Sequence, residues 1–331
     1  MAVSLSPLIF GCEGLWLTSK EIDFFAESQP FGFILFARNL ESPCQIKDLC
    51  NELRLAVGWR VPIMIDQEGG RVSRLTAPYW FEFPPALDHA DHINSERLFW
   101  LRGRLIAENL YSCGIDTNCA PLGDIAGPAT HLVLKNRCYG SDKARVIANA
   151  LALDAGQRSG GVSGVLKHIP GHGRAEQDSH IALPVVSDKQ AELSNTDFDV
   201  FRQLPSINMG MTAHLVFQDI DTTAPATHSK LMVDLIRSDI GFDGLLMTDD
   251  ITMDALQGDV VQRAQKAWAV GCDIVLHCNG NFEQMYNLAA SSGPLTNETK
   301  KRINQVIANR PNPIPVDILQ LKEEFDLLMN E

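Results

Sequence analysis

The residues best suited to chemistry lie between positions 167 and 180, in the segment KHIPGHGRAEQDSH. Its lysine, three histidines, aspartate and glutamate would suit a metal site, a phosphate-binding loop or a catalytic loop. His168 and His172 are spaced to share one face of a helix, but the proline and glycines among them disfavour a helix. The segment also lacks the GxxxxGKS/T pattern of a phosphate-binding loop. We therefore expect neither a metal ion nor a phosphate cradle here.

The end of the same segment pairs an acid with an imidazole. Asp178 and His180 are separated by one residue, so both side chains lie on the same side of an extended chain. A carboxylate beside an imidazole favours the charged form, fixes the tautomer and raises the pKa of the histidine. A general acid/base that works near neutral pH needs these properties. The alternative is a surface pair that contributes ~0–1 kcal/mol to stability.

Polar residues also follow most of the short apolar runs of the chain. They are Asp66, Asn118, Lys167, His168, His214, Asp249, Asp250, His277 and Asn279. If these runs are the parallel strands of a barrel, their carboxyl ends meet on one face, where the βα loops form active sites. Strand ends can be polar simply because they meet water, but this many histidines, lysines and aspartates favour a pocket.

Two of these sites allow more than one role. Lys167 could act as a Schiff-base nucleophile or as a cation that grips hydroxyl or carbonyl groups, and we favour the second role. Asp249 and Asp250 could form a metal pair, but successive side chains of a strand face opposite ways. We therefore expect one of them to point into the pocket and the other to cap the next turn.

The elements that must position these residues alternate along the chain. Strand-like runs lie at 7–14, 31–37, 61–70, 114–124, 162–171, 207–217, 242–250 and 272–280. Helix-like segments lie at 18–28, 42–57, 95–113, 141–159 and 258–270. Thr18 begins the first of these, and Glu21 stands at the position that completes a capping box.

Strands that alternate with helices of this length favour a parallel sheet, because parallel neighbours require a crossover. Eight such units predict a (β/α)8 TIM-type barrel rather than an open doubly wound sheet. Segments 296–311 and 316–331 predict additional C-terminal helices that cover the outside. No linker or repeat interrupts the chain, so we expect residues 1–331 to form a single catalytic domain.

The composition excludes several classes of partner. The chain has 331 residues, of which 45% are hydrophobic and 21% are charged, as is ordinary for a soluble enzyme. Its net charge of -13 and its scattered Lys and Arg residues argue against nucleic acid. The N-terminus lacks a signal peptide, and no run approaches the ~18 apolar residues of a membrane span, so we expect no membrane partner and a cytoplasmic protein. The eight cysteines form no CxxC pair and predict reduced core residues.

Four motifs, taken in order, resemble one known family. They are IDQEGGRVSR at 65–74, KHIPGHGRAEQDSH at 167–180, MTAHLVF at 211–217 and FDGLLMTDDITMDAL at 242–256. Together they resemble the bacterial β-N-acetylhexosaminidases of glycoside hydrolase family 3, of the NagZ type. The likeness extends from the first strand to about residue 280, and the combination of motifs is highly specific.

The resemblance implies a role for each matching residue. Asp249 matches the catalytic nucleophile, His180 the general acid/base, and Asp178 the partner of that histidine. The residues that match those holding the N-acetylglucosamine unit are Asp66, Arg74, Arg137, Lys167 and His168. The family needs no metal and no cofactor.

The implied reaction is the retaining hydrolysis of a terminal, non-reducing β-linked N-acetylglucosamine through a covalent glycosyl-aspartate. Anhydromuropeptides from peptidoglycan recycling are the implied natural substrate, and we expect a monomer. The sequence departs from the family at Asn136, Cys138 and Tyr139, which flank Arg137. These departures bear on the choice of leaving group more than on the chemistry.

Three other functions remain open at this stage. The first is a β-glucosidase-like hydrolase of the same family, although many such relatives carry a second domain that this chain lacks. The second is an aldolase-type barrel with Lys167 as its Schiff base, for which no second lysine or tyrosine obviously lies nearby. The third is a non-catalytic sugar-binding barrel, against which the intact set of Asp249, Asp178 and His180 argues.

Overall fold

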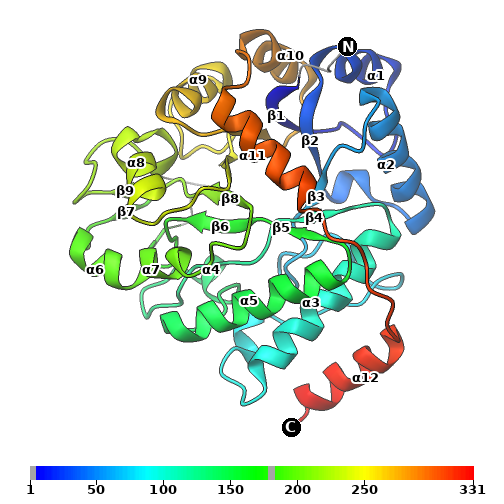
Figure 1. Cartoon of the computed structure of the whole chain (residues 1–331), viewed down its shortest axis with the longest axis vertical. Helices are drawn as coiled ribbons and strands as arrows, with labels where there is room; N and C mark the ends of the chain where they lie inside the picture. The colour runs from blue at the N-terminus through cyan, green and yellow to red at the C-terminus, as the bar shows by residue number, and fades with distance from the viewer. Residues whose placement is uncertain (1–4, 178–182) are drawn as a thin grey trace.

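A computed structural model describes residues 5–177 and 183–331, and its central feature is a closed parallel barrel (Figure 1). The sheet runs in the order β5-β4-β3-β2-β1-β11-β10-β8-β6, and every neighbouring pair is parallel. Its strands are β1 (Ser6–Gly11), β2 (Pro30–Leu35), β3 (Ile63–Ile65), β4 (Thr117–Asn118), β5 (Ser163–Gly164), β6 (Leu166–Ile169), β8 (Met209–Thr212), β10 (Leu245–Asp250) and β11 (Ile274–His277). Only Val165 separates β5 from β6, so these two pieces act as one strand and close the sheet into the predicted (β/α)8 barrel.

Helices cover the outside of the barrel. They are α1 (Ser19–Ser28), α2 (Pro43–Val57), α3 (Ser95–Ser112), α5 (Lys143–Ser159), α6 (Gln190–Asn195), α7 (Asp197–Arg202), α8 (Lys230–Ser238), α9 (Val260–Val270) and α10 (Phe282–Ser291). The five predicted helices are confirmed, whereas α6, α7, α8 and α10 were not among them. At the start of α1, the Thr18 hydroxyl accepts a hydrogen bond from the Glu21 amide, and the Glu21 carboxylate accepts one from the Thr18 amide. The predicted capping box is therefore present.

The interior of the barrel is filled by apolar side chains from alternate strand positions. Ile9, Met64, Val165, Met209 and Leu245 belong to this inner cluster, and all are buried. A second and larger cluster lies between the strands and the outer helices. The interior is therefore a packed core rather than a pore, as the fold requires.

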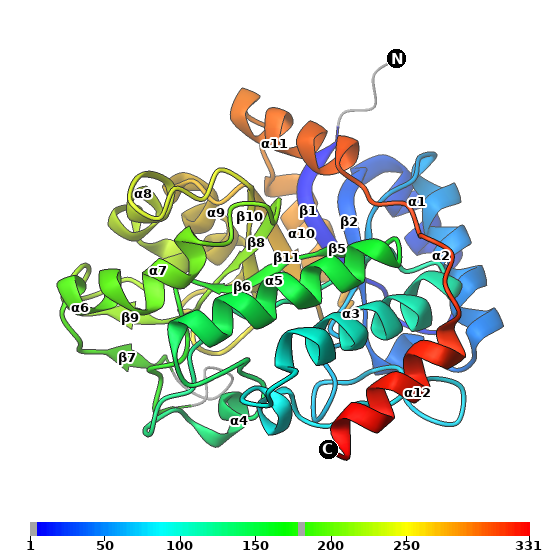
Figure 2. The same ribbon diagram turned by 60° about the horizontal axis from the view of Figure 1, so that its bottom comes forward.

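The two C-terminal helices occupy different places. Helix α11 (Asn297–Ala308) crosses one end of the barrel in Figure 1, where Ile303 and Val306 join the inner cluster. Helix α12 (Ile318–Met329) lies against α3, and Phe325 is the residue that it buries (Figure 2). Only α12 covers the outside as expected, whereas α11 closes the amino-terminal end of the barrel.

The opposite, carboxyl-terminal end carries the longer loops (Figure 2). The loop after β4 contains the short helix α4 (Leu132–Lys135), and a small parallel sheet joins β7 (Val185–Val186) to β9 (Val216–Phe217). Short 3₁₀ turns lie at Ala37–Asn39, Ala86–His89 and Ala226–His228. None of the helices in the described part of the chain is both long and apolar enough to span a bilayer.

The cysteines are all unpaired. Seven of them are buried, which matches the expectation of reduced core residues. Cys44 is exposed, so the expectation was wrong for this residue. It occupies the second position of α2, on the side that faces away from the barrel.

Candidate active site

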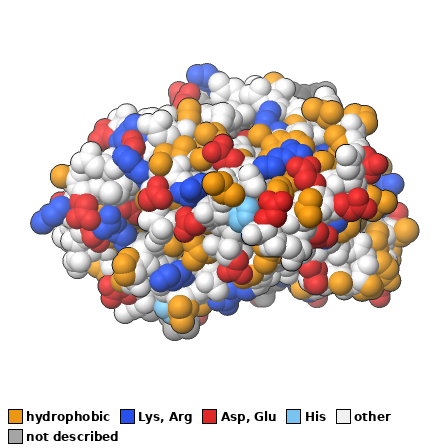
Figure 3. Space-filling model, turned by 90° about the horizontal axis from the view of Figure 1, so that it is seen from below, with side chains coloured by type: hydrophobic (Ala, Val, Ile, Leu, Met, Phe, Trp, Pro, Cys, Tyr) orange, Lys and Arg blue, Asp and Glu red, His pale blue; other side chains and the backbone are white. Residues whose placement is uncertain are grey.

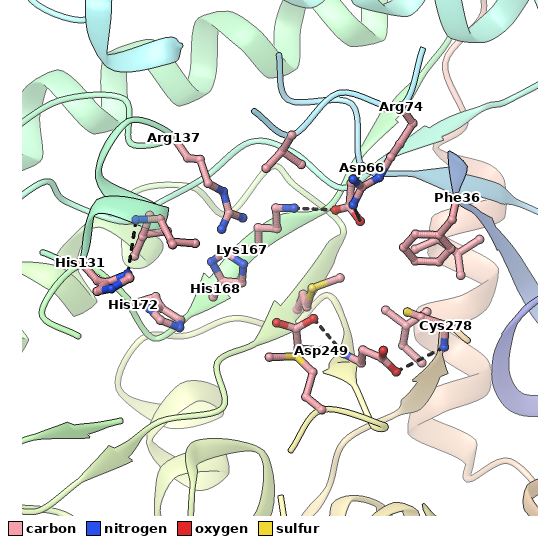
Figure 4. Close-up of a pocket in the computed structure, with 18 of the residues that line it drawn as sticks. Phe36, Asp66, Arg74, His131, Arg137, Lys167, His168, His172, Asp249 and Cys278 are labelled. Carbon is pink, nitrogen blue, oxygen red and sulfur yellow. Dashed lines mark hydrogen bonds and ion pairs between the residues drawn. The ribbon is translucent and has the colours of Figure 1, made fainter. Parts of the chain in front are cut away.

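A cavity of about 170 Å³ lies at the carboxyl-terminal end of the barrel (Figure 4). Six of the sequence-predicted site residues line it: Asp66, Arg74, Arg137, Lys167, His168 and Asp249. Other lining residues include Phe36, Val72, His131, Val133, His172, Gln177, Met253 and Cys278. Buried apolar residues of the strands, such as Ile34, Met211 and Leu276, close its inner end.

The two adjacent aspartates at the end of β10 have different environments. Both oxygens of Asp250 are bound locally, because Oδ1 accepts from the Thr252 amide (3.0 Å) and Oδ2 from the Thr252 hydroxyl (2.7 Å). Asp249 accepts one hydrogen bond, from the Asp250 amide to its Oδ1 (2.8 Å). Its other oxygen has no hydrogen bond to any residue in 5–177 or 183–331. Asp250 caps the turn as expected, but it also lines the cavity beside Asp249, so the expectation that only one of the two reaches the pocket was wrong.

Asp249 is held in its ionised form. Burial alone would raise the pKa of its carboxyl group. The charges of His214 and His168, the hydrogen bond from the Asp250 amide and the charge of Lys167 outweigh burial and lower that pKa. Asp249 can therefore present a carboxylate oxygen to the cavity throughout the neutral range.

A buried ionic network forms the wall that faces Asp249. Lys167 Nζ lies 2.7 Å from Asp66 Oδ1 and 2.7 Å from Glu68 Oε1. Arg137 binds the same Glu68 carboxylate through two parallel hydrogen bonds of 2.9 Å each. Arg74 reaches the other oxygen of Asp66 at 3.9 Å. Two carboxylates thus hold the ammonium and guanidinium groups of the cavity in fixed positions.

Glu68 was missed in the sequence, although it is central to this network. Burial would raise the pKa of its carboxyl group, but Arg137 and Lys167 lower it well below the ordinary range. The signal was present in the run DQEGGR, where Glu68 follows Asp66 on the same side of an extended chain. In a buried wall that contains an arginine and a lysine, such a glutamate is needed to neutralise charge.

Lys167 is a permanent cation in this setting. Burial would lower its pKa, but Asp66 and Glu68 raise the pKa above its ordinary value. A Schiff-base nucleophile needs a neutral amine, which desolvation or a second cation normally provides. The geometry therefore argues against the aldolase alternative and favours a binding role.

A second buried acid, Asp124, holds the histidine next to Lys167. Its Oδ2 lies 2.7 Å from His168 Nδ1, and its Oδ1 accepts from the His172 amide (2.6 Å). Burial would raise the pKa of Asp124, but the charge and hydrogen bond of His168 lower it. Asp124 ends the fourth strand-like run of the sequence and was not singled out there.

His214 completes the surroundings of Asp249. Its Nδ1 lies 2.7 Å from the Thr227 hydroxyl, and its Nε2 lies 3.1 Å from the Asp250 carbonyl oxygen. Burial lowers the pKa of His214, and this effect outweighs the opposing charges of Asp249 and Asp250 and the hydrogen bond with the Asp250 backbone. It was noticed as a strand-end residue, but no role was assigned to it.

Some sequence-predicted residues do not reach the cavity. Asn118 binds the backbone of Gln67 and the side chain of Gln157, and His277 binds Gln284 through Nε2 (3.0 Å). Asn279 likewise binds Gln284 (2.8 Å), and His214 lies beside Asp249 without lining the cavity. The expectation that polar strand ends converge on one pocket was therefore wrong for these four residues.

Asp178 and His180 lie outside the described residues. The described chain reaches Gln177, which lines the cavity, and resumes at Leu183.

Among residues 5–177 and 183–331, no three His, Cys, Asp or Glu side chains are grouped to hold a metal ion. Lys and Arg are interspersed with Asp and Glu on the face drawn in Figure 3.

Comparison with known proteins places the chain in a family. The model of the glycosyl hydrolase family 3 N-terminal domain matches residues 19–308. The chain belongs to glycosyl hydrolase family 3. This membership confirms, at the level of the family, the resemblance found in the four motifs.

The family 3 chain is similar to curated bacterial β-hexosaminidases. It is 32% identical over 286 residues to that of Pseudomonas aeruginosa, which covers 86% of this chain and 85% of the relative. It is 34% identical over 284 residues to that of Alkalilimnicola ehrlichii, covering 83% and 81%.

Solved structures of other family 3 enzymes share its fold. NagZ from Neisseria gonorrhoeae, in complex with N-trifluoroacetyl-D-glucosamine, has a TM-score of 0.86 and 29% identity, covering 99% of this chain and 97% of that one. The β-N-acetylglucosaminidase from a Paenibacillus species has a TM-score of 0.87 and 26% identity, covering 98% and 67%.

Proposed function

We propose that the protein is an exo-acting, retaining β-N-acetylglucosaminidase that removes terminal β-linked N-acetylglucosamine. The observation that carries this proposal is the ionised Asp249 in a cavity whose inner end is closed, opposite a wall of fixed hydrogen-bond donors and acceptors. A blind cavity accepts the end of a saccharide rather than an internal unit. The β-hexosaminidase names of the relatives and the glucosamine derivative bound to NagZ support the same substrate class.

In the proposed mechanism, Asp249 attacks the anomeric carbon and forms a glycosyl-aspartate. Retaining glycosidases use a carboxylate nucleophile and an acid that protonates the leaving oxygen, and this acid then acts as a base toward water. Asp249 suits the first role because it is ionised and because the Asp250 amide fixes its orientation. His180, with Asp178 as its partner, is the proposed acid/base.

The ionic wall is proposed to hold the sugar. Asp66 offers acceptors to sugar hydroxyl groups, whereas Lys167, Arg137 and His168 offer donors. Lys167 and Asp66 are already fixed by each other, so they lose little side-chain freedom when a sugar binds. Arg74 lies at the edge of the same group and is proposed to contact the substrate as well.

The biological setting is also a proposal. We propose that the substrate is N-acetylglucosaminyl-anhydromuropeptide from peptidoglycan recycling, and that the enzyme acts as a cytoplasmic monomer without a cofactor. We further propose that residues 1–331 form one catalytic domain. The packing of α11 against the barrel core and of α12 against α3 supports that view.

An assay with 4-nitrophenyl N-acetyl-β-D-glucosaminide tests the proposal against its rivals. We expect turnover that a chelator does not reduce, and a much lower rate on the matching β-D-glucoside. A preference for the glucoside would favour the β-glucosidase alternative. If both substrates bind and neither is cleaved, the barrel is a sugar-binding protein.

A further inference from the structure

Within residues 5–177 and 183–331, the Arg174 guanidinium group, just after the end of β6, makes four hydrogen bonds. Its Nε donates to Asp197 Oδ2 (2.8 Å), and its Nη2 donates to Thr196 Oγ1 (3.0 Å). Its Nη1 donates to Asp188 Oδ1 (2.5 Å) and to Glu192 Oε1 (2.7 Å). We call these five residues the Arg174 cluster. No member of the cluster lines the cavity around Asp249.

The Arg174 cluster joins the two ends of residues 175–187. At the near end, Ala175 is buried and its carbonyl oxygen accepts from the His131 amide (3.0 Å), while Gln177 reaches the cavity. At the far end stands Asp188, which Arg174 binds directly. One side chain therefore bridges the start and the finish of this stretch of chain.

Backbone pairing secures the far end in addition. The Val216 amide donates to the Pro184 carbonyl oxygen (3.0 Å), and the Gln218 amide donates to the Val186 carbonyl oxygen (2.9 Å). These bonds belong to the small β7–β9 sheet. They hold the far end to β9, whereas the Arg174–Asp188 ion pair holds the far end to the near end.

The sequence places Asp178 and His180 between the two ends that Arg174 joins. We propose that Arg174 is a positioning residue for acid/base catalysis, because it sets the distance between the two ends of the stretch that carries His180. This inference rests on the proposed acid/base role of His180. It assigns Arg174 no contact with the substrate.

Neither removal of Arg174 nor its replacement by lysine would preserve the contacts of the cluster. Without Arg174, three carboxylates face one another, and one of them, Asp197, is only 4% exposed. A buried carboxylate that loses its cation is strongly disfavoured. Lysine would restore one positive charge but not the planar fork of donors that reaches Asp188 and Asp197 together.

The test compares Arg174→Ala and Arg174→Lys with Arg302→Ala as a matched control. Arg302 also binds two aspartates, Asp243 and Asp273, but it lies on α11 at the opposite end of the barrel. The kcat/KM of each variant is measured on a dinitrophenyl N-acetyl-β-glucosaminide, which needs no acid, and on a β-linked N-acetylglucosamine disaccharide, which does.

For Arg174→Ala we expect kcat/KM on the disaccharide to fall by about tenfold or more, as small misplacements of a general acid do. On the dinitrophenyl substrate we expect a loss below about threefold, with unchanged inhibition by free N-acetylglucosamine. For Arg174→Lys we expect a kcat/KM on the disaccharide between those of the wild type and Arg174→Ala. For Arg302→Ala we expect the same relative change in kcat/KM on both substrates. Equal losses on both substrates for Arg174→Ala overturn the inference.

The double variant Arg174→Ala/His180→Ala separates this inference from the proposed function. If Arg174 acts through His180, the double variant is no slower on the disaccharide than His180→Ala alone. Losses that multiply would overturn the inference while leaving the role of His180 intact. Equal losses on both substrates for His180→Ala alone would overturn the proposed acid/base role itself, and the inference with it.

Discussion

At the scale of single residues, two adjacent aspartates of the site have different roles. Both carboxylate oxygens of Asp250 accept hydrogen bonds from Thr252, and these bonds shape the turn after β10. Asp249 keeps one oxygen for the cavity and is ionised by its surroundings. Glu68 and Asp124 likewise bind no substrate in this scheme, but they hold Lys167, Arg137 and His168 in place.

The first prediction concerns the nucleophile. Asp249→Ala should abolish turnover of an aryl N-acetylglucosaminide, because no other described carboxylate is free at that position. Loss of a catalytic group that forms a covalent intermediate costs on the order of 10⁴-fold or more in kcat. A fluorinated N-acetylglucosamine derivative should label Asp249, as mass spectrometry of the labelled peptide would reveal. Asp254→Ala, an exposed change nearby, should retain activity.

The second prediction concerns Glu68 and acid stability. The folded-state pKa of Glu68 lies below its unfolded value, so its stabilising effect is complete above about pH 4.3 and is lost as the pH falls below that value. Glu68→Gln should destabilise the protein by about 3 kcal/mol at neutral pH, because Arg137 and Lys167 lose their shared partner. The deficit should shrink at lower pH.

Denaturant unfolding of Glu68→Gln and wild type at several pH values would test this. Glu82→Gln serves as the control, since Glu82 is exposed in the same loop between β3 and α3. A deficit for Glu68→Gln that stayed constant down to acid pH would contradict the assigned linkage.

At the scale of elements, the two ends of the barrel differ: a helix covers one end, and the cavity with the proposed catalytic groups lies at the other. Helix α11 places Ile303 and Val306 against the inner cluster at the amino-terminal end. The catalytic cavity opens at the carboxyl-terminal end, where its side chains come from β6 and β10 themselves and from the segments after β2, β3, β4, β6, β10 and β11. The core contacts of α11 therefore lie at the end of the strands opposite the cavity.

The third prediction follows from that division. Ile303→Ala should lower the free energy of unfolding by about 2–4 kcal/mol, because it leaves a cavity in a packed core. The KM for an aryl N-acetylglucosaminide should not change. Thermal unfolding combined with steady-state kinetics would test both parts, with Gln305→Ala, at an exposed position of the same helix, as the control. An increased KM would show that α11 influences the site.

The eight strands could be predicted because each is a short apolar run bounded by turn residues. The position of α11 could not, because an amphipathic pattern shows that one face is buried but not which surface buries it. Asp249 and Lys167 were found through their places at strand ends. Glu68 and Asp124 were missed because they act by binding residues that are distant in the sequence: Glu68 binds Arg137, and Asp124 binds His168.

At the scale of the whole molecule, the main sheet is nearly closed, because β5 and β6, the two ends of its strand order, are joined by Val165 alone. Edge strands are a common route to association between chains, and a nearly closed sheet offers little edge for it.

The fourth prediction is that the enzyme works as a monomer of 36.5 kDa. Light scattering during gel filtration should give this mass, and the specific activity should stay constant over a wide dilution series. A specific activity that falls on dilution would indicate that association of subunits completes the site.

The charges of the cavity wall cancel one another. The carboxylates of Asp66 and Glu68, with the ionised Asp249 opposite them, balance the three cations of Lys167, Arg137 and Arg74. A neutral saccharide therefore enters without displacing counterions, and these short, mostly buried pairs are poorly reached by dissolved salt. The affinity of the enzyme for its sugar should thus be nearly independent of ionic strength, even though the protein as a whole is strongly acidic.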